Sequence, residues 1–297
     1  MRVTILGTGA MACLFGARLA AHAEIILLGT WAEAIAAIGE HGILVHEAGR
    51  DLRARVRATD RAEECLGSDL VLVLVKAWQT REAARRGEIA LAPSGLALSL
   101  QNGLGNREAL EQIFGSDKTA LGVTTLGATL LAPGEVASAG NGSVSLASHR
   151  RVEPARKLFS QAGFEVRVEE NLESLLWGKL VVNAAINPLA ALLHRPNGEL
   201  LESPDARSLM QAVGQEAARV AQAAGIALPY PDFFAEVEAT AWHSAGNRAS
   251  MLQDIERHRP TEIDAINGAI VAQAESLGLA APLNRTMWRL VRALGSL

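Results

Sequence analysis

Three polar side chains interrupt an apolar stretch of the chain at regular intervals. Lys179, Asn183 and Asn187 stand four positions apart within residues 174–193, which are otherwise almost wholly apolar. Residues four apart lie on one face of an α-helix, so an ammonium and two carboxamides would line one side of it. An ammonium can stabilise a developing alkoxide and donate a proton, and carboxamides bind hydroxyl and carboxylate groups. The pattern therefore favours a ligand-binding face, although a core helix with internally bonded polar groups shows the same spacing.

Pro188 follows this polar line directly. Proline has no N–H, so the helical hydrogen bond to the carbonyl of Ala184 is lost and a kink is expected there. A lysine, two amides and a proline in a short apolar run argue against a membrane span.

A second group of residues suited to chemistry stands at the N-terminus. An apolar run at 2–6 leads into Gly7-Thr8-Gly9-Ala10-Met11-Ala12, a G-x-G-x-x-A pattern that opens a helix predicted over 11–21, and a second apolar run follows at 25–28. Gly7 permits a tight turn, Gly9 lets the backbone approach a pyrophosphate, and Ala12 lets helix pack on strand. Strand, glycine turn, helix and strand within about 30 residues are typical of a dinucleotide-binding unit.

Two later apolar runs each end at a polar side chain. Residues 69–75 lead to Lys76, and residues 96–100 lead to Gln101-Asn102-Gly103. Ligands of open α/β sheets bind beyond the carboxyl ends of the strands, so Lys76 and Asn102 are expected to contact one. Either residue alone fits a solvated loop equally well.

The rest of the chain separates into two parts. Further strands are expected at 120–124 and 165–168 and a helix at 152–162, and Asn141-Gly142 indicates a hairpin within 134–147. Beyond the acidic residues 169–171 only helices are indicated, at 173–194, 204–224, 232–245, 247–258, 261–277 and 283–294. The predicted fold class is α/β: an N-terminal Rossmann-type dinucleotide-binding domain over 1–170, followed by an all-α domain over 171–297.

Composition restricts the class of partner. The 297 residues carry a net charge of −4, which gives no electrostatic basis for binding nucleic acid or an anionic membrane. Cys13 and Cys65 form no disulfide framework, and no signal peptide precedes the first strand, so a cytoplasmic location is expected. The seven histidines lack metal-ligand spacing, and no metal is expected.

The chain resembles the ketopantoate reductases, the 2-dehydropantoate 2-reductases of pantothenate and coenzyme A biosynthesis. The resemblance covers nearly the full length and rests on ordered blocks: GTGAMACLFGARL at the start, VKAWQT at 75–80, LQNGLGN at 100–106, WGKLVVNAAINPLAAL in the apolar stretch, PNGEL at 196–200, SMLQDI at 250–255 and TEIDAING at 261–268. It implies a Rossmann-type domain, an all-helical domain and a site in the cleft between them. The implied reaction is the reduction of ketopantoate to D-pantoate with NADPH.

The resemblance also implies roles for particular residues. Lys179 would be the general acid, and Glu262 would reach the substrate, Lys179 or the edge of the cofactor. The implied substrate contacts are Asn102, Lys179, Asn183, Asn187, Asn197, Asn247 and Ser250. The implied cofactor contacts are Gly7, Thr8, Gly9, Ala10, Met11, Ala12, Thr30, Lys76, Asn102, Ala128 and Glu262.

The expected chemistry at Lys179 depends on two opposing effects. Desolvation in a closed site lowers the pKa of an ammonium, and a neighbouring Glu262 raises it. The sequence does not set the balance between them.

The preferred nicotinamide cofactor depends on the end of the second strand. No Asp or Glu stands there to hold the ribose 2′-OH of NAD, so NADP(H) is the expected cofactor. Relatives often carry an arginine for the 2′-phosphate at this place, whereas this chain has Gly29-Thr30-Trp31. Its preference for NADPH is therefore expected to be weaker than theirs.

Three other functions remain open at this point. The chain could reduce another branched 2-keto acid, or be a β-hydroxyacid dehydrogenase of the 6-phosphogluconate type, although no DAPVSG-like loop is present. It could also sense NADP(H) without catalysis, a role expected to go with loss of Lys179 or Glu262. The family admits monomers and homodimers.

Overall fold

A computed structural model describes residues 1–295, and the chain forms two compact units. The first consists of Met1–Gln101 and Asn106–Leu172, and the second of Asn102–Gly105 and Glu173–Leu297. Each unit has its own hydrophobic core. Four residues of an early loop, Asn102–Gly105, therefore belong to the later unit.

An eight-stranded sheet forms the centre of the first unit. Its strands lie in the order β12-β11-β8-β7-β6-β1-β2-β5, parallel from β8 to β5, with β11 antiparallel to β8. They span β1 (Arg2–Leu6), β2 (Glu24–Leu28), β5 (Arg57–Thr59), β6 (Ser68–Val73), β7 (Leu91–Ser99), β8 (Thr119–Thr124), β11 (Ser143–Ala147) and β12 (Glu165–Glu169). The strand order reverses between β1 and β6, and the carboxyl ends of strands at such a switch point are where ligands bind.

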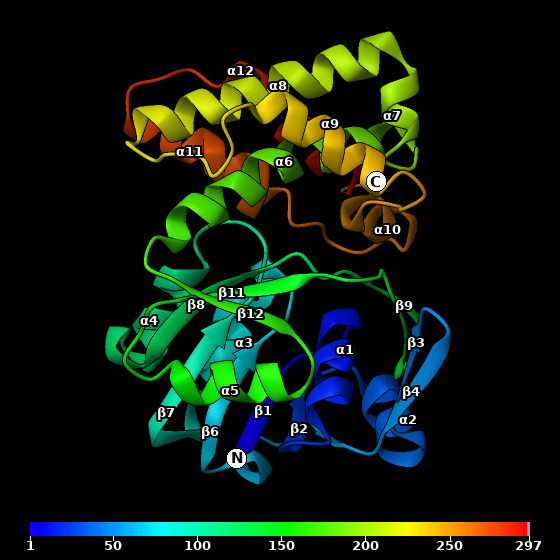
Figure 1. Ribbon diagram of the computed structural model, residues 1–297, viewed down its shortest axis with the longest axis vertical. Coiled ribbons are helices and arrows are strands. Elements are labelled where there is room, and N and C mark those ends of the chain that lie inside the picture. Colours follow the sequence, from blue (N-terminus) through cyan, green and yellow to red (C-terminus); the bar gives the residue numbers. More distant parts are fainter. Residues whose placement is uncertain (296–297) are drawn as a thin grey trace. The chain divides into compact units, whose positions relative to one another are not determined.

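Helices cover both faces of this sheet (Figure 1). On one face α1 (Ala10–Leu19) and α5 (Glu153–Gln161) bury Phe15 and Phe159, whose rings lie 5.7 Å apart. On the other face α3 (Thr80–Gly87) and α4 (Asn106–Phe114) bury Ala84 and Leu110. Because both faces are buried, the central strands are continuously apolar. The α/β fold class predicted from the sequence is confirmed.

A four-stranded sheet, in the order β4-β3-β10-β9, completes the first unit beside α2 (Ala32–His41). It contains β3 (Ile43–Glu47), β4 (Arg50–Ala54), β9 (Ala128–Ala132) and β10 (Glu135–Ser138). The expected hairpin around Asn141-Gly142 is wrong, because β10 and β11 on either side of it belong to different sheets. The hairpin here joins β9 to β10 through Gly134, which has φ +77°. Strands β3, β4, β5 and β9 had not been expected.

In residues 173–295 of the second unit the structure has helices and no strand. They are α6 (Leu172–Leu193), α7 (Glu199–Glu202), α8 (Pro204–Ala223), α9 (Phe233–His243), α10 (Ser250–Glu256), a π-helical turn at Asp264–Gly268, α11 (Ala269–Ser276) and α12 (Pro282–Leu294). The helix expected over 261–277 thus begins later and with a π-helical turn. A π-helical turn carries an extra residue per turn, and such turns often occur at functional sites.

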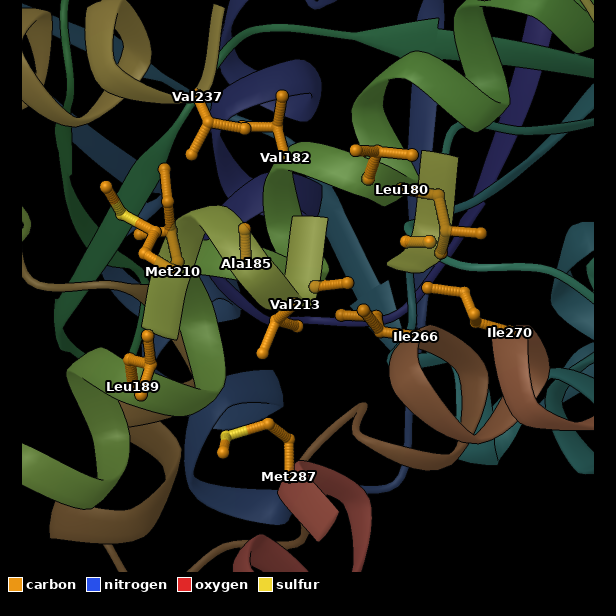
Figure 2. Packing of buried hydrophobic residues seen from close by; sticks show 14 of the residues in the cluster. Leu180, Val182, Ala185, Leu189, Met210, Val213, Val237, Ile266, Ile270 and Met287 are labelled. Carbon is orange, nitrogen blue, oxygen red and sulfur yellow. The ribbon is translucent and has the colours of Figure 1, made fainter. Parts of the chain in front are cut away.

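The apolar side chains of α6 form the centre of the second core. Figure 2 shows Leu180, Ala185 and Leu189 of this helix among side chains from other elements, including Met210 of α8 and Ile266 of the π-helical turn. Among the described residues, α6 is the one helix long and apolar enough to cross a membrane. However, 67% of its most apolar window is buried inside the protein, as in a core helix.

Candidate active site

The glycine turn connects β1 to α1 at the switch point of the large sheet. Gly7 has φ +118°, a conformation that side-chain-bearing residues rarely adopt. Helix α1 begins after Gly9, with no side-chain cap and no acidic residue in its first turn. The first N–H groups of a helix have no intrahelical acceptor, and the helix dipole places positive potential there. This end of α1 is therefore suited to an anion.

The space around the turn fits a dinucleotide pyrophosphate. A Cβ added to Gly9 would have no atom within 4 Å, so a ligand can approach the backbone there. Ala12 is fully buried against the sheet, as close packing of helix on strand requires. Thr8 packs against the residue that follows β2, where a Cβ on Gly29 would lie 2.7 Å from Thr8 Cγ2. The turn thus lies against the end of β2, the strand whose end faces the adenosine ribose in Rossmann folds.

A hydrogen-bond network joins the carboxyl ends of β6 and β7. Gln101 Nε2 donates to the carbonyl of Val75 and to Thr80 Oγ1, both at 2.8 Å. Lys76 is partly exposed, and its backbone N–H donates to Gln79 Oε1 at 3.3 Å. Sequence reasoning missed Gln101, which holds the segment carrying Lys76 in place. The neighbouring Asn102 had been the expected contact.

The other residues of this unit that were predicted to bind the cofactor are at least partly exposed to solvent. Ala10 and Met11 open α1 and are partly exposed. Thr30 follows β2 and is exposed, and Ala128 begins β9 and is partly exposed. Their contact with a cofactor stays a prediction.

In the second unit, α6 carries the polar line expected from the sequence. Lys179 and Asn183 are partly exposed, whereas Asn187 is 8% exposed. All three lie on one helix whose apolar residues between Trp177 and Ala191 are buried, and the spacing of four places them on a common face.

Three of the predicted site residues meet around the carboxylate of Glu262. Glu262 is only 6% exposed, and Asn102 Nδ2 donates to its Oε2 at 3.3 Å. Glu262 also acts on Lys179: burial lowers the pKa of that ammonium to about 8, and the attraction of Glu262 partly opposes the fall. Lys179 keeps some solvent exposure while its ammonium is surrounded by protein. The site thus contains a lysine that can give up a proton near neutral pH.

The loop Asn102–Gly105 is held by the π-helical turn. The N–H of Leu104 donates to the carbonyl of Ala265 at 2.9 Å. A Cβ on Gly103 would lie 2.5 Å from that oxygen, and this glycine has φ +80°, so only glycine allows the approach. This docking places Asn102 beside Glu262.

Asn197, Asn247 and Ser250 form a second group in the same unit. The backbone N–H of Asn197 donates to the carbonyl of Asn247 at 3.0 Å, and its Nδ2 donates to Ser244 Oγ at 2.9 Å. The Oδ1 atom of Asn197 is buried and accepts no hydrogen bond within the described residues. Ser250 begins α10 and, like Asn247, is exposed. The described part of the chain thus leaves one buried acceptor of this group without a donor, which is uncommon for a buried polar atom.

A buried polar network that the sequence did not reveal supports α6 beside its proline. Asn267 Nδ2 donates to the carbonyl of Ala184 at 3.2 Å, where the N–H of residue 188 would donate in an ordinary helix. It also donates to Asn284 Oδ1 at 3.0 Å, and Asn284 Nδ2 donates to Glu216 Oε1 at 2.9 Å. Both asparagines are fully buried and Glu216 is 5% exposed. The segment that carries Glu262 is therefore hydrogen-bonded to the helix that carries Lys179.

The structure brings Asn102, Lys179 and Glu262 together, and it groups Asn197 with Asn247. Gly7, Thr8, Gly9 and Ala12 form one turn in the other unit. Chemically, the first group offers an acid of pKa about 8 with a carboxylate beside it. The glycine turn offers an anion-binding backbone.

Two family models match the chain. Residues 3–151 match the model described as "Ketopantoate reductase PanE/ApbA". Residues 171–295 match "Ketopantoate reductase PanE/ApbA C terminal". Together these matches cover both units.

Similar proteins support the same grouping over the whole length. The 2-dehydropantoate 2-reductase of Pyrococcus abyssi is 36% identical over 300 residues, covering 98% of this chain and 97% of that protein. A PanE/ApbA family ketopantoate reductase from Ralstonia eutropha JMP134 has a crystal structure with a TM-score of 0.93, 33% identity, and coverage of 100% and 99% of the two chains. A ternary structure of D-mandelate dehydrogenase with NADH and anilino(oxo)acetate has a TM-score of 0.92, 29% identity and the same coverage.

Proposed function

Because the chain belongs to the ketopantoate reductase family, we propose that it reduces 2-dehydropantoate, that is ketopantoate, to D-pantoate with NADPH. The observation that carries this proposal is Lys179, with its lowered pKa, beside the buried carboxylate of Glu262 on a helix lined with asparagines. The role in pantothenate and coenzyme A biosynthesis follows from that reaction.

Lys179 is the proton donor in this proposal. A nicotinamide held in the site would supply the hydride that the carbonyl carbon of the keto acid accepts. The carbonyl oxygen then gains negative charge, which the ammonium of Lys179 stabilises, and Nζ gives its proton to that oxygen to form the hydroxyl. A pKa of about 8 suits the step because the group is largely protonated near neutral pH and yet releases its proton readily.

Glu262 keeps the lysine in its charged form. Burial alone would lower the pKa of Lys179 further, and the carboxylate of Glu262 raises it. Asn102, which donates to Glu262 Oε2, holds this carboxylate in place.

The asparagines bind the rest of the substrate. Asn183 and Asn187 lie one and two helical turns beyond Lys179, so their amides can donate to the hydroxyl and carboxylate of a 2-keto acid without adding charge. Asn197, whose buried Oδ1 accepts no hydrogen bond within residues 1–295, is a further proposed substrate contact.

The glycine turn would hold the dinucleotide. Its residues fit a pyrophosphate at the N-terminus of α1, with Thr30, Lys76 and Ala128 as further contacts. Because no carboxylate stands at the end of β2 to hold a ribose 2′-OH, NADPH is the proposed cofactor.

A second candidate is the NADH-dependent reduction of another 2-keto acid. It is supported by the similarity to D-mandelate dehydrogenase, which binds NADH in its solved structures, and by the absence of an arginine at Thr30. The 6-phosphogluconate-type alternative is not retained, because both family models that match are those of ketopantoate reductase.

Location and assembly are part of the proposal. Cys13 and Cys65 are buried free thiols, which fits a reducing cytoplasm. We expect no nucleic-acid or membrane partner, and either a monomer or a homodimer.

A screen of cofactor oxidation across 2-keto acids tests the function. NADPH and NADH should each be offered with ketopantoate, phenylglyoxylate and unbranched 2-keto acids. The expected result is the highest kcat/KM for ketopantoate with NADPH. A kcat/KM at least ten times higher for another keto acid would show that the substrate is wrong, and NADPH binding without any turnover would favour a sensor.

A further inference from the structure

Arg86 lies in the last turn of α3, a short helix rich in charged residues that are typical of a solvent-exposed surface. Its helix packs its other side on the sheet, where Thr80, Ala84 and Gly87 are buried. A Cβ on Gly87 would lie 2.7 Å from Leu6 Cδ2, so this turn of α3 packs tightly against the end of β1. The base of the Arg86 side chain is thereby fixed.

The guanidinium of Arg86 reaches the carboxyl ends of two strands. Its Nη2 donates to the carbonyl of Asp60 at 2.7 Å and lies 3.4 Å from the carbonyl of Gly29. Gly29 follows β2 and Asp60 follows β5. In Rossmann folds the end of the second strand is where the ribose 2′ position of the dinucleotide lies, and an arginine nearby accommodates a 2′-phosphate.

Part of the hydrogen-bonding capacity of this guanidinium, and its positive charge, are not used by other described residues. Within residues 1–295 its Nε and Nη1 donate no hydrogen bond, and it forms no ion pair with a carboxylate. A guanidinium binds phosphate through charge-assisted, often bidentate hydrogen bonds. The exposed Thr30, next to Gly29, adds one neutral hydroxyl.

We propose that Arg86 supplies the cationic group that recognises the 2′-phosphate of NADPH, in place of the arginine missing at Thr30. The proposal rests on the proposed function and deepens it by naming the residue that sets cofactor preference. Two backbone carbonyls orient the guanidinium, so a long-range contact from α3 replaces a local side chain of the loop after β2.

Calorimetric titration of the full-length protein with 2′,5′-ADP and with 5′-AMP tests this role without turnover. Wild type should bind 2′,5′-ADP more tightly. Arg86→Gln keeps a neutral donor for the carbonyls and removes the charge, so affinity for 2′,5′-ADP should fall by about 10- to 100-fold while that for 5′-AMP is retained. Arg86→Lys should keep part of the preference and provides a second variant if the glutamine protein folds poorly. The matched control is Arg85→Gln, an exposed neighbour on the same helix, which should change neither affinity.

The outcomes separate the two proposals. A wild type that prefers 2′,5′-ADP, with Arg86→Gln unchanged, would overturn the role of Arg86 and leave NADPH as cofactor. Equal weakening for both ligands would show that Arg86 only ties two strand ends together. A wild type with no preference would overturn both this inference and the choice of NADPH.

Discussion

The candidate site of the first unit consists mainly of backbone groups, whereas that of the second unit consists of side chains. In the first, the glycine turn and the end of α1 offer backbone N–H groups and open space, and an added Cβ on Gly9 meets nothing. In the second, the groups are polar side chains whose burial is energetically unfavourable. Glu262 and Asn187 are 6% and 8% exposed, and burial lowers the pKa of Lys179. A site in which backbone N–H groups bind the ligand tolerates most side-chain substitutions around it. A buried charge tolerates little, because removing its partner leaves it unpaired.

The largest expected effect tests whether the second unit carries the chemistry. Lys179→Ala should lower kcat by about 10²–10⁴-fold, the usual contribution of general acid catalysis, while the fold persists. Steady-state kinetics with circular dichroism would measure both. Lys157→Ala, an exposed lysine on α5, should leave kcat unchanged. A near-normal kcat in Lys179→Ala would end the proposed mechanism.

The second prediction distinguishes residues of α6 that bind the substrate from the one that donates the proton. Asn183→Ala and Asn187→Ala should each raise KM for the keto acid by about tenfold or more, because a hydrogen bond to a charged group contributes about 1.5–3 kcal/mol. The effect on kcat should be smaller. Gln222→Ala, exposed on α8, is the control. If either variant lost kcat with an unchanged KM, its amide would act in the transition state and not in substrate binding.

A pH profile tests the electrostatics of Lys179. The proton donor must be protonated, so kcat for reduction should fall as pH rises above about 8, the pKa of Lys179. Glu262 raises that pKa, so Glu262→Gln should move the falling limb to lower pH. An unmoved limb would mean that another group, or a step other than proton transfer, sets the pH dependence.

The smallest expected effect concerns the loop of the first unit. Thr30→Arg should increase the ratio of kcat/KM for NADPH to that for NADH by about fivefold, since a charge-assisted bond exceeds a neutral one by about 1 kcal/mol. With Arg86 already at this edge, the gain should be smaller in wild type than in Arg86→Gln. A Thr30→Arg protein with no gain in either background would show that this loop does not face the 2′ position.

Local patterns predicted the fold class, because each pattern reflects a short-range property. The glycine turn needs only neighbouring residues, and the spacing of four on α6 needs only a helix. The strands β4 and β5 were missed because exposed positions leave them no continuous apolar run, and β3 was missed because its apolar run, at 43–45, is only three residues long. The Asn141-Gly142 turn was misread because its flanking strands pair with β3, β9, β8 and β12 instead of with each other.

Long-range contacts explain what the sequence could not show at the candidate site. Arg86 lies 57 positions from Gly29, and nothing in its own segment distinguishes it from Arg85. Asn267 donates to Ala184, 83 positions away. The balance that sets the pKa of Lys179 likewise depends on a carboxylate on a different segment.

The contact between Asn267 and the carbonyl of Ala184 also constrains how this protein can change over evolution. The carbonyl needs that side chain because Pro188 brings no N–H to it. If the proline were replaced first, the helix itself would supply a donor to this carbonyl, and Asn267 would then be needed only for its hydrogen bond to Asn284 Oδ1. If the asparagine were lost first, a buried carbonyl would lose its donor, at about 1–3 kcal/mol. The carbonyl of Ala184 therefore keeps a donor throughout only if the proline is replaced before the asparagine.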